Sequence, residues 1–401
     1  MADAQDRFAA LPESPFPRLN DLLAGIKPGA EPLMMSLGEP QHPFPDFVRE
    51  ELRAHEADYG RYPPIVGTAG FRDAVAGWLG RRFDLPVGAV DPDTQILPVN
   101  GTREALFNIA LLASPPEKAG KQPAILIPNP FYQCYAAAAL AAGAEPRYIA
   151  ARTENGFLPD FEGLPGDLLA RTSIVYFCSP ANPQGAVADK DYLKRLITLA
   201  RHHGFLLVMD ECYSDIYDKV PPAGALSACL ELPVPASGDA FENVIVFHSL
   251  SKRSSLPGLR SGFCAGDKKL MMRFRSFRNI AAPQSPLPVL AAAAAAWNDD
   301  AHAAENRALY QKKIDAAERI LGNRFGFYRP AGGFFLWLDV GDGEAAARQI
   351  WEKGGVKVLP GKYLSRDDEA GNPGEAYIRV ALVHPQDTTE DGLKRLANAL
   401  G

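Results

Sequence analysis

A lysine in a serine- and glycine-rich segment is the residue whose position most suggests covalent chemistry. Lys252 follows the apolar run 244–248, and Arg260 stands eight residues after it. A lysine amine can form a Schiff base with an aldehyde, although most lysines in proteins are solvated surface charges. Ser249 and Ser251 precede it and, together with Arg260, offer donors to an anion such as a phosphate group.

Two further polar segments also follow apolar runs directly. Asp210 and Tyr213 come after the run 205–209, and Asn182 lies in a proline-flanked loop after the run 173–178. The carboxylate can hold a cationic ring nitrogen, and the tyrosine can bind a neighbouring phenolate oxygen. In isolation, Asp210 is equally well explained as a helix cap and Asn182 as a turn residue.

A third segment combines a glycine turn with the start of a predicted helix. Gly101, Thr102 and Arg103 follow the apolar run 95–99. Free backbone N–H groups at a helix start attract anions. Many loops between strands and helices have the same sequence pattern, so this segment gains weight only in combination with the others.

An alternation of short strands and helices must position these segments. The strands are apolar on both faces, which is typical of a parallel sheet covered by helices on both sides. The sequence therefore predicts a large doubly wound α/β domain, in which ligands lie outside the carboxyl ends of the strands. The predicted strands are 95–99, 124–127, 173–178, 205–209 and 244–248, and the predicted helices are 104–113, 132–142 and 190–203.

The C-terminal part predicts a smaller α+β domain. Its candidate strands are 334–340, 356–359 and 377–382, and its candidate helices are 344–352 and 390–400. One long helix, 289–321, is expected to link the two domains, and Pro12, Pro15 and Pro17 predict an extended N-terminal arm. The expected division is 1–50 for the arm and part of the small domain, 51–288 for the large cofactor-binding domain and 289–401 for the small domain.

Together the polar segments match the chemistry of pyridoxal 5′-phosphate. Lys252 would bind the aldehyde, and Asp210 would keep the pyridine nitrogen protonated so that the ring withdraws electrons. Once displaced by an amino-acid substrate, the lysine would act as general base and acid. Ser249, Ser251, Arg260 and the N–H groups near 101–103 would hold the phosphate.

The sequence resembles the fold type I pyridoxal-phosphate aminotransferases of class I/II from about Leu37 to the C-terminus. An S-x-S-K motif with an arginine eight residues later, preceded in order by N-P-x-G and D-x-x-Y, is a specific combination. The matching segments are LGEP (37–40), RYPPIVGTAGFRDAV (61–75), NGTREAL (100–106), NPFYQCY (129–135), SPANPQG (179–185), DECY (210–213), SLSKRSSLPGLRSGF (249–263) and YIRVAL (377–382).

This resemblance implies a role for each matching residue. Catalysis falls to Lys252, Asp210 and Tyr213, and Arg379 with Gly38 and Asn182 would bind the substrate carboxylate. A strand arginine facing solvent is an equally good interpretation of Arg379 from the sequence alone. Tyr62 would reach the phosphate of the neighbouring subunit, which implies a homodimer with shared active sites. The implied cofactor-binding residues are Gly101, Thr102, Arg103, Tyr132, Asn182, Asp210, Tyr213, Ser249, Ser251, Lys252, Arg260 and Tyr62.

Two further segments of the sequence narrow the class of substrate. DECYSDIY (210–217) and the ending 359–385 resemble bacterial N-succinyl-LL-diaminopimelate aminotransferases. These would move an amino group between succinyl-diaminopimelate and 2-oxoglutarate, the amino donor and the 2-oxo acid acceptor. Both substrates carry several carboxylates, so a second cation is expected. The candidates are Arg18, Arg61, Arg278, Lys362 and Arg366, each of which is otherwise a solvated charge.

Other functions on the same scaffold remain open. An aspartate or aromatic aminotransferase and a Cβ–Sγ lyase share the cofactor motifs, because small changes around one cofactor alter the reaction. A non-catalytic regulatory module would need a DNA-binding domain, for which little chain precedes Leu37.

Composition excludes several classes of partner. The 401 residues carry 42 Lys and Arg against 48 Asp and Glu, a net charge of −6, which disfavours nucleic acid. The longest apolar run, 287–297, is too short to cross a membrane. The five cysteines form no C-x-x-C pair and the seven histidines show no metal-ligand spacing. We therefore expect a cytoplasmic protein without a metal site.

Overall fold

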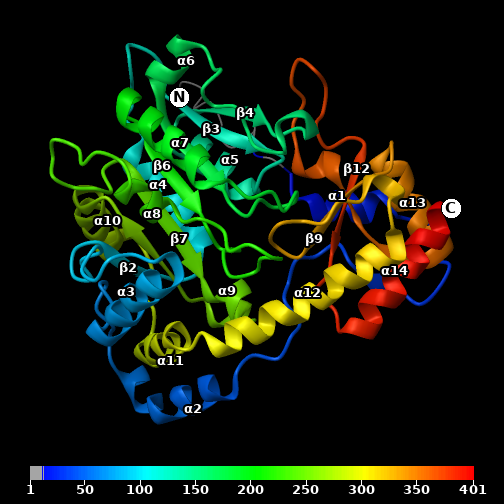
Figure 1. Cartoon of the computed structure of the whole chain (residues 1–401), viewed down its shortest axis with the longest axis horizontal. Coiled ribbons are helices and arrows are strands. Elements are labelled where there is room, and N and C mark those ends of the chain that lie inside the picture. The colour runs from blue at the N-terminus through cyan, green and yellow to red at the C-terminus, as the bar shows by residue number, and fades with distance from the viewer. Residues whose placement is uncertain (1–10, 12) are drawn as a thin grey trace, which may run out of the picture.

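A seven-stranded sheet forms the larger part of the computed structural model, which describes residues 11 and 13–401 (Figure 1). The strand order is β2-β8-β7-β6-β5-β3-β4, and only β8 runs antiparallel to its neighbours. The sheet confirms the predicted α/β class. Its strands are β2 (Ile96–Val99), β3 (Ala124–Asn129), β4 (Glu145–Ala150), β5 (Thr172–Cys178), β6 (Leu206–Asp210), β7 (Val244–Ser249) and β8 (Gly262–Gly266).

The central strands are buried on both faces, as their continuous apolar runs predict. In the pairing register, Asp210 lies beside Cys178 on β5 and beside Phe247 on β7. The carboxyl ends of these three strands therefore meet at one edge of the sheet, where the polar segments of the sequence follow them.

Helices cover both faces of the large sheet. Side chains of α2, α3, α7, α8 and α11 share one apolar core with the strands, and those of α4, α5 and α10 share the core on the other face. The bounds are α2 (Asp46–Ala54), α3 (Ala69–Phe83), α4 (Thr102–Ala113), α5 (Gln133–Ala141), α6 (Gly166–Arg171), α7 (Lys190–His203), α8 (Ala225–Leu230), α9 (Leu250–Arg253), α10 (Lys268–Ala281) and α11 (Leu287–Asn298).

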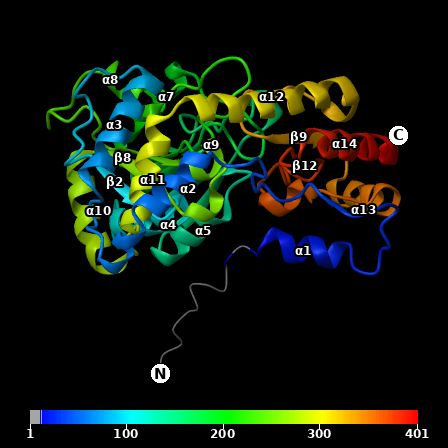
Figure 2. The same cartoon turned by 90° about the horizontal axis from the view of Figure 1, so that it is seen from below.

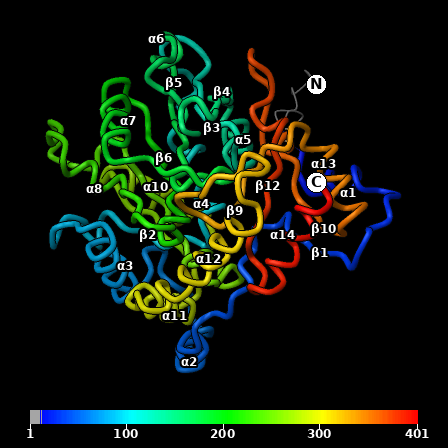
Figure 3. The backbone as a smooth tube through the Cα atoms, turned by 45° about the vertical axis from the view of Figure 1, so that its right-hand side comes forward, coloured from blue at the N-terminus to red at the C-terminus, as the bar shows by residue number. Residues whose placement is uncertain are grey.

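A second, three-stranded sheet forms a smaller layer with helices at its side, confirming the predicted smaller domain. It has the order β11-β12-β9, and all its pairs are antiparallel. A separate parallel pair joins β1 to β10, so that an N-terminal and a C-terminal segment of the chain lie side by side (Figure 3). The elements are β1 (Leu33–Met34), β9 (Phe335–Asp339), β10 (Val356–Lys357), β11 (Leu359–Pro360), β12 (Tyr377–Ala381), α13 (Gly343–Gly354) and α14 (Gln386–Leu400).

The long helix predicted at 289–321 is two helices, and that prediction was wrong. α11 ends at Asn298, and α12 (Ala301–Leu321) begins after two aspartates. Asp299 has extended backbone angles, and its carboxylate accepts hydrogen bonds from the N–H groups of Ala301 and His302. An aspartate that caps the following helix in this way favours a break in the chain direction. α12 alone runs from the large sheet toward the small one (Figures 1 and 2).

The N-terminal segment also differs from the prediction. Pro15 and Pro17 lie in the first turn of α1 (Pro15–Leu22), so this part is helical rather than extended (Figure 2). Proline suits a first helical turn because the missing N–H would have no partner there. Pro12 lies outside the described residues, and the domain limits at 50/51 and 288/289 stay predictions. Over the described ranges, no helix is both long and apolar enough to cross a membrane.

Candidate active site

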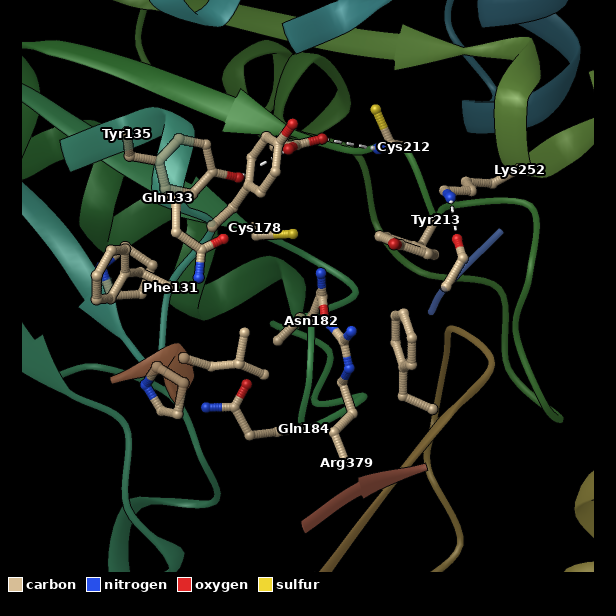
Figure 4. A pocket seen from close by; sticks show the side chains of 18 of the residues that line it. Phe131, Gln133, Tyr135, Cys178, Asn182, Gln184, Cys212, Tyr213, Lys252 and Arg379 are labelled. Carbon is tan, nitrogen blue, oxygen red and sulfur yellow. Dashed lines mark hydrogen bonds between the residues drawn. The ribbon is translucent and has the colours of Figure 1, made fainter. Parts of the chain in front are cut away.

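A cavity of about 450 Å³ opens at the carboxyl ends of β5, β6 and β7. Cys178, Asp210 and Ser249, which end these strands, line its floor, and Phe335 of β9 with Arg379 of β12 lines it from the small sheet. Figure 4 shows Lys252, Tyr213, Asn182 and Arg379 directed toward the same space. The cavity therefore lies where the two sheets face each other.

Most of the predicted site residues meet in this cavity. Gly101 is adjacent to it, whereas Tyr62 lies elsewhere with 99% of its surface exposed. The predicted residues that line the cavity are Gly38, Thr102, Arg103, Tyr132, Asn182, Asp210, Tyr213, Ser249, Ser251, Lys252, Arg260 and Arg379.

Lys252 lies on the short helix α9, which begins directly after β7. The hydroxyl of Ser249 caps this helix by accepting a hydrogen bond from the N–H of Ser251 at 3.1 Å. The lysine amine donates to the carbonyl of Gly38 at 2.6 Å, and the ring of Tyr213 lies 5.9 Å away. Burial lowers the pKa of this amine to about 8. About a tenth of the amine is therefore unprotonated at pH 7, far more than for an ordinary lysine, and able to act as a nucleophile.

Asp210 lines the cavity at the end of β6, as Glu39 does from the N-terminal segment, whereas Glu211 beside Asp210 is not part of the lining. One oxygen of Asp210 accepts the hydroxyl proton of Tyr135 at 2.7 Å, and the other accepts the N–H of Cys212 at 3.3 Å. Glu211 is buried beside His248, with 3.0 Å between its Oε2 and the ring Nε2. Of two adjoining carboxylates, only Asp210 is held in place to meet a ligand.

The corner formed by Gly101 and Arg260 is shaped for an anion. Arg260 has a left-handed backbone (φ 56°), and its guanidinium donates to the carbonyl of Asn100 at 3.2 Å. Gly101 has a φ of 74°, and a Cβ placed there would meet that guanidinium at 2.0 Å. Only glycine can leave this space open. The first turn of α4 begins immediately after it with N–H groups that have no partner within the helix.

Arg379 is a buried cation on the opposite wall. Its guanidinium donates to Asn182 Oδ1 at 3.0 Å and to the carbonyl of Ser36 at 2.8 Å. Its Nε is buried and has no hydrogen-bond partner within the described residues. Burial lowers its pKa to about 10, which leaves it charged at neutral pH. A buried guanidinium with an unused N–H group can bind a carboxylate.

Two tyrosines complete the cavity as neutral phenols. Burial raises the pKa of Tyr132 to about 12, and the Arg103 guanidinium hydrogen-bonds its hydroxyl. Burial also raises the pKa of Tyr213 well above its usual value. Both hydroxyls therefore keep their protons at neutral pH and can donate hydrogen bonds.

These features fit pyridoxal 5′-phosphate. The cavity holds an amine with a lowered pKa, a carboxylate fixed by two hydrogen bonds and an anion corner that a single Cβ would fill. The orphaned Nε of Arg379 adds a place for the carboxylate of an amino acid. This donor set provides for an aldehyde, a ring nitrogen and a phosphate in one space.

None of the five cations predicted to meet a distal carboxylate lines the cavity. Arg278 pairs with Glu104 at 2.8 Å in the interior, and Lys362 pairs with Glu375 at 3.0 Å. The remaining candidates are Arg18 over the ring of Tyr363, Arg61 against Asp58 and Arg366 over the ring of Phe131. These cations are paired with carboxylates or aromatic rings. Most of those partners are distant in the sequence, so the sequence pattern around each cation does not reveal them.

The sequence analysis missed several residues of the cavity. Tyr135 binds Asp210, and its place one helical turn after Tyr132 was a usable signal. Gln133 and Gln184 also line the cavity, as Figure 4 shows. Phe334 lies with its ring 5.3 Å from the Lys252 amine. No sequence pattern distinguishes these three from ordinary polar or core residues.

Comparison with known proteins places these features in a family context. The model of the family described as aminotransferase class I and II matches residues 32–396. An LL-diaminopimelate aminotransferase of Dehalococcoides mccartyi is 31% identical over 98% of this chain and 97% of its own length. The 4-dedimethylamino-4-oxo-anhydrotetracycline transaminase OxyQ of Streptomyces rimosus is 33% identical over 87% of this chain and 88% of its own length.

A solved structure shares the whole architecture. The crystal structure of an aminotransferase from Neisseria meningitidis superimposes with a TM-score of 0.92 and is 40% identical. The match covers 98% of this chain and 99% of that one. The similarity therefore extends over both sheets of this chain.

Proposed function

The chain belongs to the class I and II aminotransferases, and on that premise we propose that its amino donor is of the diaminopimelate class. It is a pyridoxal-phosphate-dependent transaminase that acts on amino acid and 2-oxo acid substrates. The specific reaction we propose moves an amino group between N-succinyl-LL-2,6-diaminopimelate and 2-oxoglutarate, in lysine and diaminopimelate biosynthesis.

One observation carries the choice of the diaminopimelate class of donor. The D. mccartyi relative named LL-diaminopimelate aminotransferase matches nearly all of both chains. The succinylated form of the donor is proposed from the likeness of segments 210–217 and 359–385 to the succinyl-diaminopimelate enzymes. The S. rimosus transaminase is named for an anhydrotetracycline substrate. A similar chain can therefore have a substrate outside the diaminopimelate class, and the substrate has to be tested directly.

Pyridoxal phosphate, when bound, supplies an aldehyde for an amine and a ring that withdraws electrons from the reacting carbon. We assign Lys252 to the covalent attachment, since its amine lies in the cavity with a pKa of about 8. Asp210 would hold the proton on the ring nitrogen, and Asn182 with Tyr213 would bind the phenolic oxygen. Tyr132 would stack on the ring.

The phosphate would occupy the corner beside Gly101. Ser249 and Ser251 lie 2.9 Å apart by their hydroxyls, and Arg260 lies against Gly101. The N–H groups of the α4 start, at Thr102 and Arg103, would complete the set of donors. We propose a homodimer in the cytoplasm, in which the exposed Tyr62 reaches the phosphate of the neighbouring subunit.

The substrate carboxylate would bind Arg379, beside the backbone of Gly38. Since the Lys252 amine already donates to the Gly38 carbonyl, the amine lies next to this carboxylate site. Lys252 would take the proton from the substrate Cα as a general base. It would then deliver a proton to C4′ of the cofactor as a general acid. The buried walls of Phe334 and Phe335 would keep water from the reacting carbon.

Parallel rate measurements test the substrate assignment. The cofactor-loaded protein is assayed with 2-oxoglutarate and, in turn, N-succinyl-LL-diaminopimelate, LL-diaminopimelate, aspartate and phenylalanine, and pyruvate release from cystathionine reports a lyase. We expect the highest kcat/KM with N-succinyl-LL-diaminopimelate. A higher value with aspartate or phenylalanine, or pyruvate as the main product, would overturn the proposal.

A further inference from the structure

Two uncharged amides line the side of the cavity away from Lys252 (Figure 4). Gln133 is the first residue of α5, and Gln184 lies in the loop after β5. In Figure 4 both lie across Asn182 and Arg379 from Lys252. None of the groups assigned above to the cofactor or to the α-carboxylate requires them.

Neither amide is satisfied by the protein. The Nε2 of Gln133 is buried and has no hydrogen-bond partner within the described residues. Gln184 is only 2% exposed, and its side-chain amide lines the cavity without a hydrogen-bond partner within the described residues. Its backbone carbonyl accepts the hydroxyl of Tyr328 at 2.7 Å. A buried N–H group without a partner costs free energy, and the Gln184 amide beside the same cavity offers a second unused donor and acceptor. The pair therefore favours a ligand that hydrogen-bonds to both.

The walls around the two amides are apolar. Phe131, Phe157, Leu158 and Leu364 line this end of the cavity. A ligand group that fits here therefore presents an alkyl chain together with a small number of hydrogen-bonding atoms.

No uncommitted cation faces this end among the described residues. The cationic side chains in the lining already have partners: Arg103 binds the Tyr132 hydroxyl, and Arg260 binds backbone carbonyls. Arg379 and Lys252 are assigned above to the substrate α-carboxylate and to the cofactor, so neither is left to pair with a group at this end. A carboxylate enclosed by these apolar walls would lose its hydration without gaining a charged partner from this chain, so the distal carboxylates of an acylated donor would have to stay hydrated at the open mouth of the cavity while its amide lies between the walls.

We infer that Gln133 and Gln184 form a subsite for a carboxamide carried on the alkyl chain of the amino donor. Each glutamine amide offers both a donor and an acceptor, which matches the N–H and C=O of a substrate amide. An acylated amine on the chain is such an amide, whereas a free ammonium or carboxylate is not. The inference rests on the proposed transaminase function and refines it, because it separates N-acylated from free diaminopimelate.

The test uses three donors of equal length that do not depend on the diaminopimelate assignment. They are 2-aminoadipate 6-amide, 2-aminoadipate and norleucine, which end in an amide, a carboxylate and a methyl group. The rate of the first half-reaction of the cofactor-loaded protein is followed by its change in visible absorbance. We expect the amide donor to have the highest second-order rate constant, by about tenfold over either of the others.

Variants locate the effect in the two glutamines. Gln133→Leu and Gln184→Leu keep the volume but remove hydrogen bonding, and each should lower the rate for the amide donor about tenfold while changing norleucine less than about threefold. Leu158→Ala, in the same wall, is the control and should alter all three donors alike. An unchanged visible spectrum and unfolding midpoint show that each variant folds and holds the cofactor.

The outcomes distinguish the two proposals. Equal losses for all donors in the glutamine variants, or a wild-type preference for 2-aminoadipate or norleucine, would overturn the carboxamide subsite. A preference for the amide that vanishes in both variants would support the subsite even if no diaminopimelate derivative reacts, in which case only the substrate assignment fails. No reaction with any amino donor, including glutamate, would contradict both.

Discussion

Two lysines of this chain are withdrawn from water, and their surroundings differ. Lys252 extends into a cavity of about 450 Å³, where its amine has a single hydrogen-bond partner, the Gly38 carbonyl. Lys313, on α12, is 2% exposed and is enclosed by His42 Nε2 at 2.6 Å and by the Leu382 carbonyl at 3.1 Å. Burial lowers the pKa of both amines, to about 8 and about 7 respectively.

The comparison shows that a lowered pKa does not by itself make a lysine amine reactive. By pKa alone Lys313 is the more shifted, yet it does not line the cavity. Its partner His42 is bonded to Asn306, which in turn donates to the backbone carbonyls of Lys252 and Arg253 at 3.0 Å. Lys313 therefore belongs to a network that supports the backbone of Lys252, whereas Lys252 has space for a reactant.

The largest effect should come from replacing the lysine in the cavity. We expect Lys252→Ala to lower kcat/KM by at least about 10⁴-fold, the upper end of what proton-transfer groups contribute, because it also removes the covalent attachment. Lys313→Met should lower it by less than about tenfold, since it removes only support. The visible absorbance of the loaded protein should disappear in the first variant and persist in the second. The opposite pattern would break the distinction between the two lysines.

The second-largest loss of activity should come from replacing the carboxylate of Asp210. Asp210→Asn keeps the shape but removes the negative charge, so we expect kcat to fall by about 10²- to 10⁴-fold. Tyr135→Phe removes only one hydrogen bond to that carboxylate and should cost about tenfold or less. Steady-state kinetics of both variants would show whether charge or positioning matters more. Equal losses would contradict the role given to Asp210.

A smaller effect is expected on cofactor affinity from the anion corner. Gly101→Ala places a methyl group against Arg260 at a φ of 74°, so we expect the affinity for pyridoxal phosphate to fall about 10- to 100-fold. Gly258→Ala, in the loop before Arg260, meets no atom within 4 Å and should leave affinity unchanged. Equilibrium titration of the apoprotein measures both. Similar affinities for the two variants would remove the support for a phosphate at this corner.

The smallest effect on activity, but a clear one on stability, concerns Lys313. Its pKa is about 7 when folded and rises to an ordinary value of 10.5 on unfolding. Between these values the unfolded state binds more protons, so the free energy of unfolding should rise with pH by up to about 1.4 kcal/mol per unit. The gain is absent below pH 7 and complete above about pH 10.5. Urea unfolding of wild-type apoprotein and Lys313→Met across this window should differ by that slope, and parallel curves would contradict a buried neutral amine.

The sequence predicted those site residues whose place depends only on the strand that they end or follow. Asp210 ends an apolar strand, and Lys252 and Asn182 stand within four residues of the end of another. Parallel strands bring their carboxyl ends together at one edge of the sheet. Gly101 was found for the same reason. These predictions needed only the strand pattern and the residue that follows each strand.

The remaining features depend on contacts between distant segments. Gln133 and Gln184 lie 51 positions apart, and only the fold turns both into one cavity. Lys313 lies within an ordinary helical pattern, and its burial by His42 joins residues 271 positions apart. The break between α11 and α12 was a different kind of error, since the capping Asp299 was visible in the sequence.

The most direct test of the account is chemical. Cofactor-loaded protein is treated with borohydride, which fixes a cofactor joined to an amine, and is then digested and mapped by mass spectrometry. We predict that the added mass lies on Lys252 alone. Modification of Lys313 or of any other lysine in place of Lys252, or none after loading, would contradict the central claim.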